Sequence, residues 1–398
     1  MLVKTENNRS FFAVCITNFL VRMEWGIATG LMPIQIYELG GSPIEVGLVF
    51  TVFSSIQVVS PLLWGALSDS LGRRKIFIVT GMLGLPPIYL LIANQKTILL
   101  LILLRGTTAI FKGAVVTCSW ALVSDLSTPD KVGRNMGVLG FSELAGFGVG
   151  PVVGGLIAEQ SGFSTLWYSV ALICLAGGLV FLIAGRDSSK LRRGKKDSST
   201  LHNVWRKSLF MQMLVISLAY AVLLVSYSFL GPNLNVYLTR DLGYSKSAIG
   251  LILLSGTGIA TFLQLFFGYV SDRWSRRLVM ILGCISLSLG HLVLLQSGQI
   301  LWVVLSQTLI QCHNAFFMAA AAHVADTISF SEKSRALSLL DSIGSIARAA
   351  SAVAGGLVIA ITDVQTALKI AAAFPAVTIL IVTLMVKSSS RPEVAQQR

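Results

Sequence analysis

Charged residues are scarce in this chain: they make up 12% of its 398 residues, while hydrophobic residues make up 54%. A composition this apolar excludes an ordinary soluble domain. Acidic residues are the scarcer kind, 18 against 31 basic ones, which leaves a formal net charge of +13. The long apolar runs between the charges predict a protein that crosses a membrane many times.

The sequence also lacks the usual signatures of enzymes and of metal or nucleotide sites. Its five cysteines lie in separate apolar runs, without the paired spacing of disulfides or metal ligands. The pair Gly194-Lys195 has Ser189 where a phosphate-binding loop would need its first glycine. No nucleophile elbow is present. We therefore predict that the chain is not an enzyme and that it has no metal site and no cofactor.

Twelve apolar segments are long enough to cross a bilayer, which takes about 20 residues. They are 10–31, 44–64, 76–93, 98–123, 135–158, 164–184, 208–230, 247–270, 278–296, 300–325, 335–361 and 364–386. If both termini are cytoplasmic, the basic residues of the loops and tails lie almost all on the inner side. The outer side then has only Lys96, Arg240, Lys246 and Lys369. The positive-inside rule thus predicts that both termini are cytoplasmic, and we expect a multi-pass protein of the plasma (cell inner) membrane. The basic charge then reflects topology, and we predict no nucleic-acid partner.

A short charged loop occurs twice in the chain. Residues 65–75 read GALSDSLGRRK, and residues 268–277 read GYVSDRWSRR, at a constant offset of 203 residues. A repeat on this scale predicts two related halves. We expect an all-α membrane protein with twelve transmembrane helices in two pseudo-symmetric six-helix bundles. The bundles would be 1–185 and 208–398, joined by a basic cytoplasmic linker, 186–207.

This loop, its place between the second and third spans and its second copy resemble the major facilitator superfamily. The resemblance implies a secondary transporter that works by alternating access. It further implies that Asp69 and Arg73 belong to a cytoplasmic gate, with Asp125 as partner. The gate residues carried over, with their counterparts in the second half, are Gly65, Asp69, Gly72, Arg73, Asp125, Arg134, Asp272, Arg276, Asp326 and Arg335. The alternative is a charge cluster that only orients the two spans.

Residues 146–155 read GFGVGPVVGG and form a strip of small residues. The pattern resembles the fifth-helix motif of proton-coupled antiporters in the 12-helix drug:proton branch of the superfamily. Its residues are Gly146, Gly150, Pro151, Gly154 and Gly155. The resemblance favours an exporter. Such strips also occur wherever two helices pack closely.

Several charged residues lie within the predicted spans, where charge is costly and usually serves a pathway for ions or substrate. Arg22 and Glu24 are near the middle of the first span and, about 200° apart on a helix, face different neighbours. Arg105 and Lys112 are two turns apart and share a face. Gln311 shares a face with other polar residues of the tenth span. Arg22, Glu24, Arg105, Lys112 and Gln311 are the candidate cavity residues.

We interpret Glu24 as the proton-carrying carboxylate, for which protonation and substrate binding compete. The function predicted first is proton-coupled export of a small amphiphilic or drug-like molecule by a monomer in the lipid bilayer. A second reading is transport of an organic anion or anionic amphiphile that Arg22, Arg105 and Lys112 attract. This transport would not require proton coupling. A third, of another class, is a transporter-like membrane receptor that does not cycle.

Overall fold

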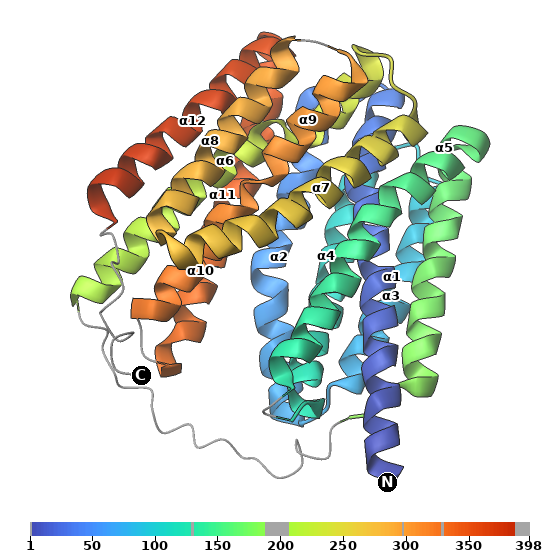
Figure 1. Cartoon of the computed structure of the whole chain (residues 1–398). Helices are drawn as coiled ribbons and strands as arrows, with labels where there is room; N and C mark the ends of the chain where they lie inside the picture. The colour runs from blue at the N-terminus through green and yellow to red at the C-terminus, as the bar shows by residue number, and fades with distance from the viewer. Residues whose placement is uncertain (1, 129–130, 188–206, 297, 328–329, 387–398) are drawn as a thin grey trace. The chain divides into compact units, whose positions relative to one another are not determined.

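A computed structural model describes residues 2–128, 131–187, 207–296, 298–327 and 330–386 (Figure 1). Over these ranges the chain is helical and contains no β-strand, so the predicted all-α class is confirmed. The first helices are α1 (Leu2–Glu38), α2 (Pro43–Leu71), α3 (Lys75–Ala93), α4 (Ile98–Leu126), α5 (Val132–Ala184) and α6 (Lys207–Arg240). They are followed by α7 (Lys246–Arg273), α8 (Arg276–Gln296), α9 (Ile300–Gln311), α10 (Asn314–Thr327), α11 (Phe330–Ile361) and α12 (Val364–Met385).

The helices pack into two compact units. The first unit contains α1 to α5 together with residues 232–254, which are the end of α6 and the start of α7. Within it α1 lies along α5, α2 packs on α4, and α3 packs on α4 and α5. The second unit contains the remaining parts of α6 and α7 and the helices α8 to α12, with α8 packed on α12, α9 and α10. The predicted domain borders stay a prediction, and most of the predicted linker, 188–206, lies outside the described residues.

Side-chain caps begin α2 and α12, among other helices. Ser42 caps α2: its hydroxyl accepts from the Glu45 amide at 3.3 Å, and the Glu45 carboxylate accepts from the Ser42 amide at 2.8 Å. This reciprocal pair satisfies two backbone donors that a helix start leaves free. Asp363 caps α12 through the Thr366 amide at 2.6 Å, and that hydrogen bond holds the pKa of the Asp363 carboxyl below its usual value.

Helix α5 is interrupted at Gly162, where φ is +80° and ψ is 173°. A positive φ is accessible to glycine because it has no Cβ. The chain reverses there, so that the two arms of α5 run in opposite directions (Figure 1). These arms correspond to the predicted segments 135–158 and 164–184.

A second interruption was not predicted. The segment 300–325 was expected to be one continuous span, but it consists of α9 and α10 separated by Cys312 and His313. No proline or glycine lies at this break. The His313 ring stacks on Tyr227 of α6 at 4.2 Å between centroids, and its Nδ1 lies 2.7 Å from the Ile310 carbonyl. The Ile310 carbonyl also accepts from the His313 amide at 3.3 Å, so both the ring and the backbone of His313 contact it where the regular helix ends.

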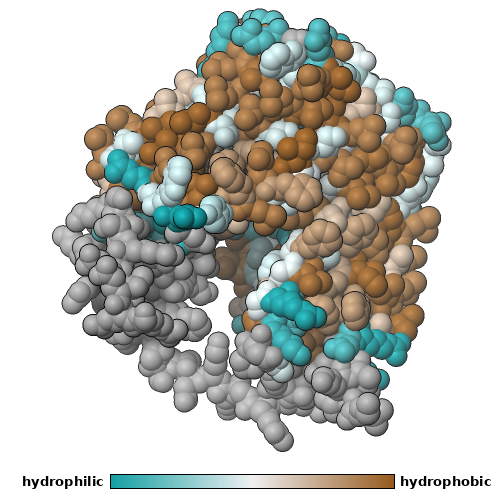
Figure 2. Space-filling view, in the orientation of Figure 1, coloured by the Kyte–Doolittle hydropathy of each residue, from teal (hydrophilic) through white to brown (hydrophobic). Residues whose placement is uncertain are grey.

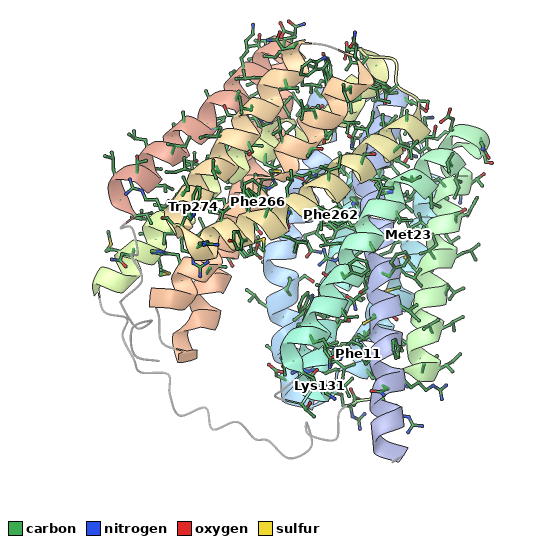
Figure 3. The ribbon with its side chains drawn as sticks, in the orientation of Figure 1. Phe11, Met23, Lys131, Phe262, Phe266 and Trp274 are labelled. Carbon is green, nitrogen blue, oxygen red and sulfur yellow. The ribbon has the colours of Figure 1, made fainter. Side chains whose placement is uncertain are left out.

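The outer surface suits a lipid environment. In the described part of the chain, eleven helical stretches are long and apolar enough to cross a membrane, with α9 and α10 counted together. Hydrophobic residues cover the sides of the helices in Figure 2, and hydrophilic residues gather near the ends. Along α7, Phe262 and Phe266 are 76% and 59% exposed, with Trp274 just beyond the helix (Figure 3). Soluble proteins rarely expose so many large aromatic and aliphatic side chains. Such a surface indicates contact with lipid.

Candidate functional site

Glu24 of α1 lies at the centre of a buried charge cluster in the first unit. Its side chain has no exposed area. Arg105 Nη1 is 3.1 Å from Oε1, and Lys112 Nζ is 2.7 Å from Oε2. The Tyr89 hydroxyl donates a hydrogen bond to Oε1. Each carboxylate oxygen therefore has its own cation, which offsets the cost of burying the charge.

Neighbouring helices fix the partners of Glu24. Arg105 and Lys112 stand seven residues apart in α4 and so project from one face. Tyr89 comes from α3, and its ring stacks on Trp167 of α5 with the centroids 5.7 Å apart. The Trp167 indole N–H in turn donates to Gln35 of α1 at 2.8 Å. Because both rings are fully buried, the Tyr89 hydroxyl is held at a fixed position.

Aromatic rings shield the cations of the cluster. The Arg105 guanidinium carbon lies 4.1 Å from the ring centre of Phe53 of α2. Lys112 Nζ lies 5.0 Å from Phe53 and 5.1 Å from Trp25. Cation–π contacts of this kind contribute about 0.5 to 2 kcal/mol each, more where water is absent. The rings thus take the place of water around Arg105 and Lys112.

A second ion pair lies beside the first. Arg22 Nη2 is 2.7 Å from Glu143 Oε2, and the Trp120 indole N–H donates to Glu143 Oε1 at 2.9 Å. The Arg22 guanidinium carbon is 4.6 Å from the Trp25 ring centre. Because Lys112 contacts the same ring, Trp25 links the two ion pairs. As their spacing predicts, Arg22 and Glu24 of α1 meet different helices.

The cluster contains more positive than negative charge. Its cations are Arg22, Arg105 and Lys112, and its carboxylates are Glu24 and Glu143. Three cations against two carboxylates leave a formal surplus of one positive charge. Charge at membrane depth is costly, so a surplus there indicates a site with a function beyond packing.

The glycine strip of α5 brings α1 close enough to form this cluster. A Cβ on Gly146 would lie 2.1 Å from the Phe19 carbonyl oxygen, and one on Gly150 would lie 2.3 Å from the Met23 carbonyl oxygen. Both contacts are with backbone, which cannot give way as a side chain can. Met23 precedes Glu24, so the strip sets the depth and rotation of the carboxylate.

The rest of the motif packs in the same way. A Cβ on Gly155 would lie 2.4 Å from the Lys246 carbonyl oxygen at the start of α7, and one on Gly154 would lie 2.9 Å from Leu31. Pro151 is buried within α5, and a Cβ on Gly250 of α7 would lie 2.4 Å from its carbonyl oxygen. The strip is thus a packing surface toward α1 and α7, and its link to antiport stays a prediction.

In the loop of the predicted gate, Arg74 makes the ion pairs that the sequence assigned to Arg73. Arg74 forms ion pairs with Asp69 and, at 3.5 Å, with Asp125 of α4, and it donates to Ser68 at 2.5 Å. Arg73 is exposed. The reason is the turn at Gly72, which ends α2 with φ +61° and directs the following arginines differently.

Other predicted gate residues contribute less to this cluster. Gly65 of α2 lies against α4 in ordinary contact, and Arg134 is exposed near the start of α5. In the second copy, Arg276 donates to Ser271 at 3.0 Å. The side chains of Asp272, Asp326 and Arg335 lie outside the described residues.

Gln311 belongs to the second unit, where it is the last residue of α9. It is half-buried, and its carbonyl accepts from the Asn314 side chain at 3.1 Å. The structure therefore brings together four of the five candidate cavity residues, Glu24, Arg105, Lys112 and Arg22. The fifth, Gln311, belongs to the other unit.

Sequence reasoning missed several residues of the site. Tyr89 and Phe53 were not singled out, although a tyrosine within a strongly apolar span is a signal for a buried hydrogen bond. The partner of Glu143 could not be assigned from sequence. Asp187, just beyond α5, was also missed: its Oδ1 accepts from the amides of Arg74 and Lys75, each at 2.7 Å, and so caps α3.

Among the described residues, no group of three or more His, Cys, Asp or Glu side chains could hold a metal ion.

Comparison with known proteins gives consistent results. The sequence profile of the Major Facilitator Superfamily matches residues 14–224 and 216–398. An uncharacterized MFS-type transporter of Methanocaldococcus jannaschii is 24% identical over 392 residues, 96% of this chain and 99% of that protein. The multidrug resistance protein MdtG of Proteus mirabilis is 27% identical over 290 residues, 69% of this chain and 70% of that protein.

Solved structures show the same fold. The crystal structure of the nucleoside transporter NupG superimposes with a TM-score of 0.79 at 17% identity, covering 97% of this chain and all of that one. These comparisons confirm the predicted family resemblance and the prediction that the protein is not an enzyme. A profile match over nearly the whole length shows that the chain belongs to the Major Facilitator Superfamily of transporters.

Proposed function

We propose that the chain is a secondary active transporter that exports a small amphiphilic molecule in exchange for protons, with Glu24 as the proton-carrying carboxylate. The observation that carries the proposal is the complete burial of Glu24 between Arg105 and Lys112. An ionisable group at membrane depth usually serves transport of an ion or substrate. The likeness to a protein named for multidrug resistance supports an exported, drug-like cargo.

Protonation of Glu24 supplies a physical drive for a conformational change. It removes the negative charge that both Arg105 and Lys112 contact, and two buried cations are left facing a neutral acid. Their mutual repulsion is strong at low dielectric and favours a packing in which α1 and α4 separate or new counterions enter. Release of the proton restores both ion pairs. The proton thus biases an equilibrium between two packings.

The proposed membrane arrangement has twelve spans in two six-helix bundles. At about 1.5 Å per residue, the 53 residues of α5 would extend about 80 Å as one helix, far more than a hydrocarbon core of about 30 Å. The reversal at Gly162 divides them into two crossings. The protein would then be a monomer in the plasma membrane with cytoplasmic termini, and it would work by alternating access.

The cluster of Asp69, Arg74 and Asp125 is the proposed inner gate. Ion pairs at the cytoplasmic ends of α2 and α4 would stabilise one of the alternating conformations and break in the other. Asp69 is mostly exposed, so water can solvate it once the pair opens.

Proton coupling is tested with purified protein in liposomes that contain a pH-sensitive dye. In the wild type, ethidium transport should follow an imposed pH gradient and move protons in the opposite direction. We expect Glu24→Gln to lower gradient-driven transport at least tenfold, because the amide cannot exchange a proton. Ethidium exchange without a gradient should persist.

The matched control is Glu38→Gln, the same change at the end of α1, where Glu38 is 44% exposed and pairs with Lys246. Its gradient-driven transport should stay within twofold of the wild type. Unchanged coupling in Glu24→Gln would contradict the role of Glu24, and binding of ethidium without any flux would favour a receptor.

Transport of an organic anion is the second candidate, and the surplus positive charge of the cluster favours it. A ligand carrying one negative charge would balance Arg22, Arg105 and Lys112 against Glu24 and Glu143. Flux of 1-naphthoate measured beside flux of ethidium in the same liposomes separates the two candidates.

A further inference from the structure

Arg22 differs from the other two cations of the cluster in its access to ligand. Its side chain is 18% exposed, whereas those of Arg105 and Lys112 are 3% exposed. Of its donors, Nη2 contacts Glu143, while the buried Nε has no hydrogen-bond partner among the described residues. A guanidinium presents five N–H donors in a planar fork suited to carboxylates. Arg22 therefore has unused capacity to bind an anion.

The surroundings of Arg22 are aromatic. Its guanidinium lies over Trp25, whose ring is 5.9 Å from the Phe147 ring in an edge-to-face arrangement. Trp120 holds the other oxygen of Glu143. Trp25, Trp120 and Phe147 are all half-buried, so part of each ring remains open to contact. Flat apolar rings beside an accessible cation fit a planar aromatic group that carries a negative charge.

The charge of the cluster leads to the same class of ligand. With one bound carboxylate, three cations face three carboxylates, and the formal charge is zero without any change of protonation. A neutral ligand would leave the surplus positive charge, and a cationic one would double it. Glu143 already occupies the Nη2 side of Arg22, so an incoming anion has to share or take that position.

We propose that Arg22 is the receptor for the anionic group of a planar aromatic ligand, and that Glu143 is its competitor within the chain. The inference rests on the second candidate under the proposed function, transport of an organic anion, in that this ligand is taken to be cargo. The ligand carboxylate bonds to the Arg22 fork, its ring contacts Trp25, and Glu143 turns away while it keeps the hydrogen bond from Trp120.

Equilibrium binding to the purified full-length protein tests this assignment. The probe is 1-naphthoate, compared with 1-naphthalenemethanol and 1-naphthylmethylamine, and the readout is quenching of tryptophan fluorescence together with thermal stabilisation. We expect the wild type to bind the carboxylate at least tenfold more tightly than the alcohol or the amine. Absence of that preference, or no binding of 1-naphthoate at millimolar concentration, would overturn the proposal.

Substitutions on the two sides of the ion pair should act in opposite directions. Arg22→Gln removes the receptor, so 1-naphthoate should bind at least tenfold more weakly. Glu143→Gln removes the competitor, so it should bind about tenfold more tightly. A purely structural ion pair would instead make both variants weaker, and that result would refute the competition. The controls are Lys246→Gln and Glu38→Gln. Each breaks the ion pair between the last residue of α1 and the first residue of α7, and each should leave binding unchanged.

If Arg22→Gln does not fold, Arg22→Lys provides the second variant. It keeps the charge and loses the fork, so binding should weaken severalfold while the melting temperature stays near that of the wild type. Flux measured beside binding with the wild-type protein separates this inference from the proposed function. Tight, Arg22-dependent binding without proton-driven flux would contradict the proposed export, whereas proton-driven flux of ethidium with no carboxylate preference would contradict the role of Arg22.

Discussion

Tyr89 shows how a single hydroxyl supports the buried charge of Glu24. It donates to Glu24 Oε1, and Arg105 Nη1 lies 3.2 Å from its oxygen. The oxygen is enclosed, and the ring is fixed by stacking on Trp167. Removing the hydroxyl would leave the ring packing intact and take one hydrogen bond from a buried carboxylate.

We therefore expect Tyr89→Phe to lower the free energy of unfolding by about 1.5 to 3 kcal/mol, the range for a hydrogen bond to a charged group. Thermal and denaturant unfolding in detergent measure this change. Tyr168→Phe is the control, because it also removes a hydroxyl donor, here to Asn94 at 2.9 Å, at an exposed position. The control should change stability by less than about 0.5 kcal/mol. Equal losses in the two variants would contradict a special role for Tyr89.

At the residue scale, the sequence could identify which charges are unusual but not which of them meet. Glu24, Arg22, Arg105 and Lys112 stand out because charge is rare in apolar spans. Their partners depend on the rotation of each helix, which apolar segments with hydrophobic residues on all sides do not reveal. For the same reason Arg74 could not be told from Arg73: the two are adjacent, and only the left-handed turn at Gly72 decides which one faces Asp69.

At the scale of elements, long apolar helices were predictable and their interruptions only in part. Two spans were predicted on either side of Gly162, and glycine supplies the positive φ found there. The break between α9 and α10 has no proline or glycine to signal it. At the break, His313 stacks on Tyr227, a contact between residues 86 positions apart. Local propensity contains no information on such a contact.

The close approach of α1 and α5 yields a prediction at the same scale. A methyl group at position 150 would sit 2.3 Å from the Met23 carbonyl oxygen, so Gly150→Ala must move α1 and with it Glu24. We expect a loss of about 1 to 3 kcal/mol in the free energy of unfolding, typical of overpacking, together with lower gradient-driven transport. Gly137→Ala in the same helix meets nothing within 4 Å and should stabilise the protein slightly. Similar effects of the two changes would show that the strip is not a tight interface.

At the scale of the whole molecule, transport requires that access to the site change sides. The proposed inner gate is a feature of one unit: Arg74 bridges Asp69 of α2 and Asp125 of α4, and Ser68 joins the same cluster. Cys118 of α4 is fully buried and stands seven residues, about two helical turns, before Asp125, on the same face of the helix. Its thiol is a native reporter of whether the gate is closed.

Arg74→Gln should open this cluster, because the amide cannot neutralise two carboxylates that then repel each other. We expect a membrane-impermeant maleimide, added from the cytoplasmic side, to label Cys118 at least fivefold faster than in the wild type, as measured by peptide mass spectrometry. Arg73→Gln, which removes a neighbouring exposed arginine, should leave the labelling rate within about twofold. If Arg73→Gln accelerated labelling and Arg74→Gln did not, the gate would have to be reassigned to Arg73. Unchanged labelling in both would mean that these ion pairs orient the helices of the first unit without controlling access.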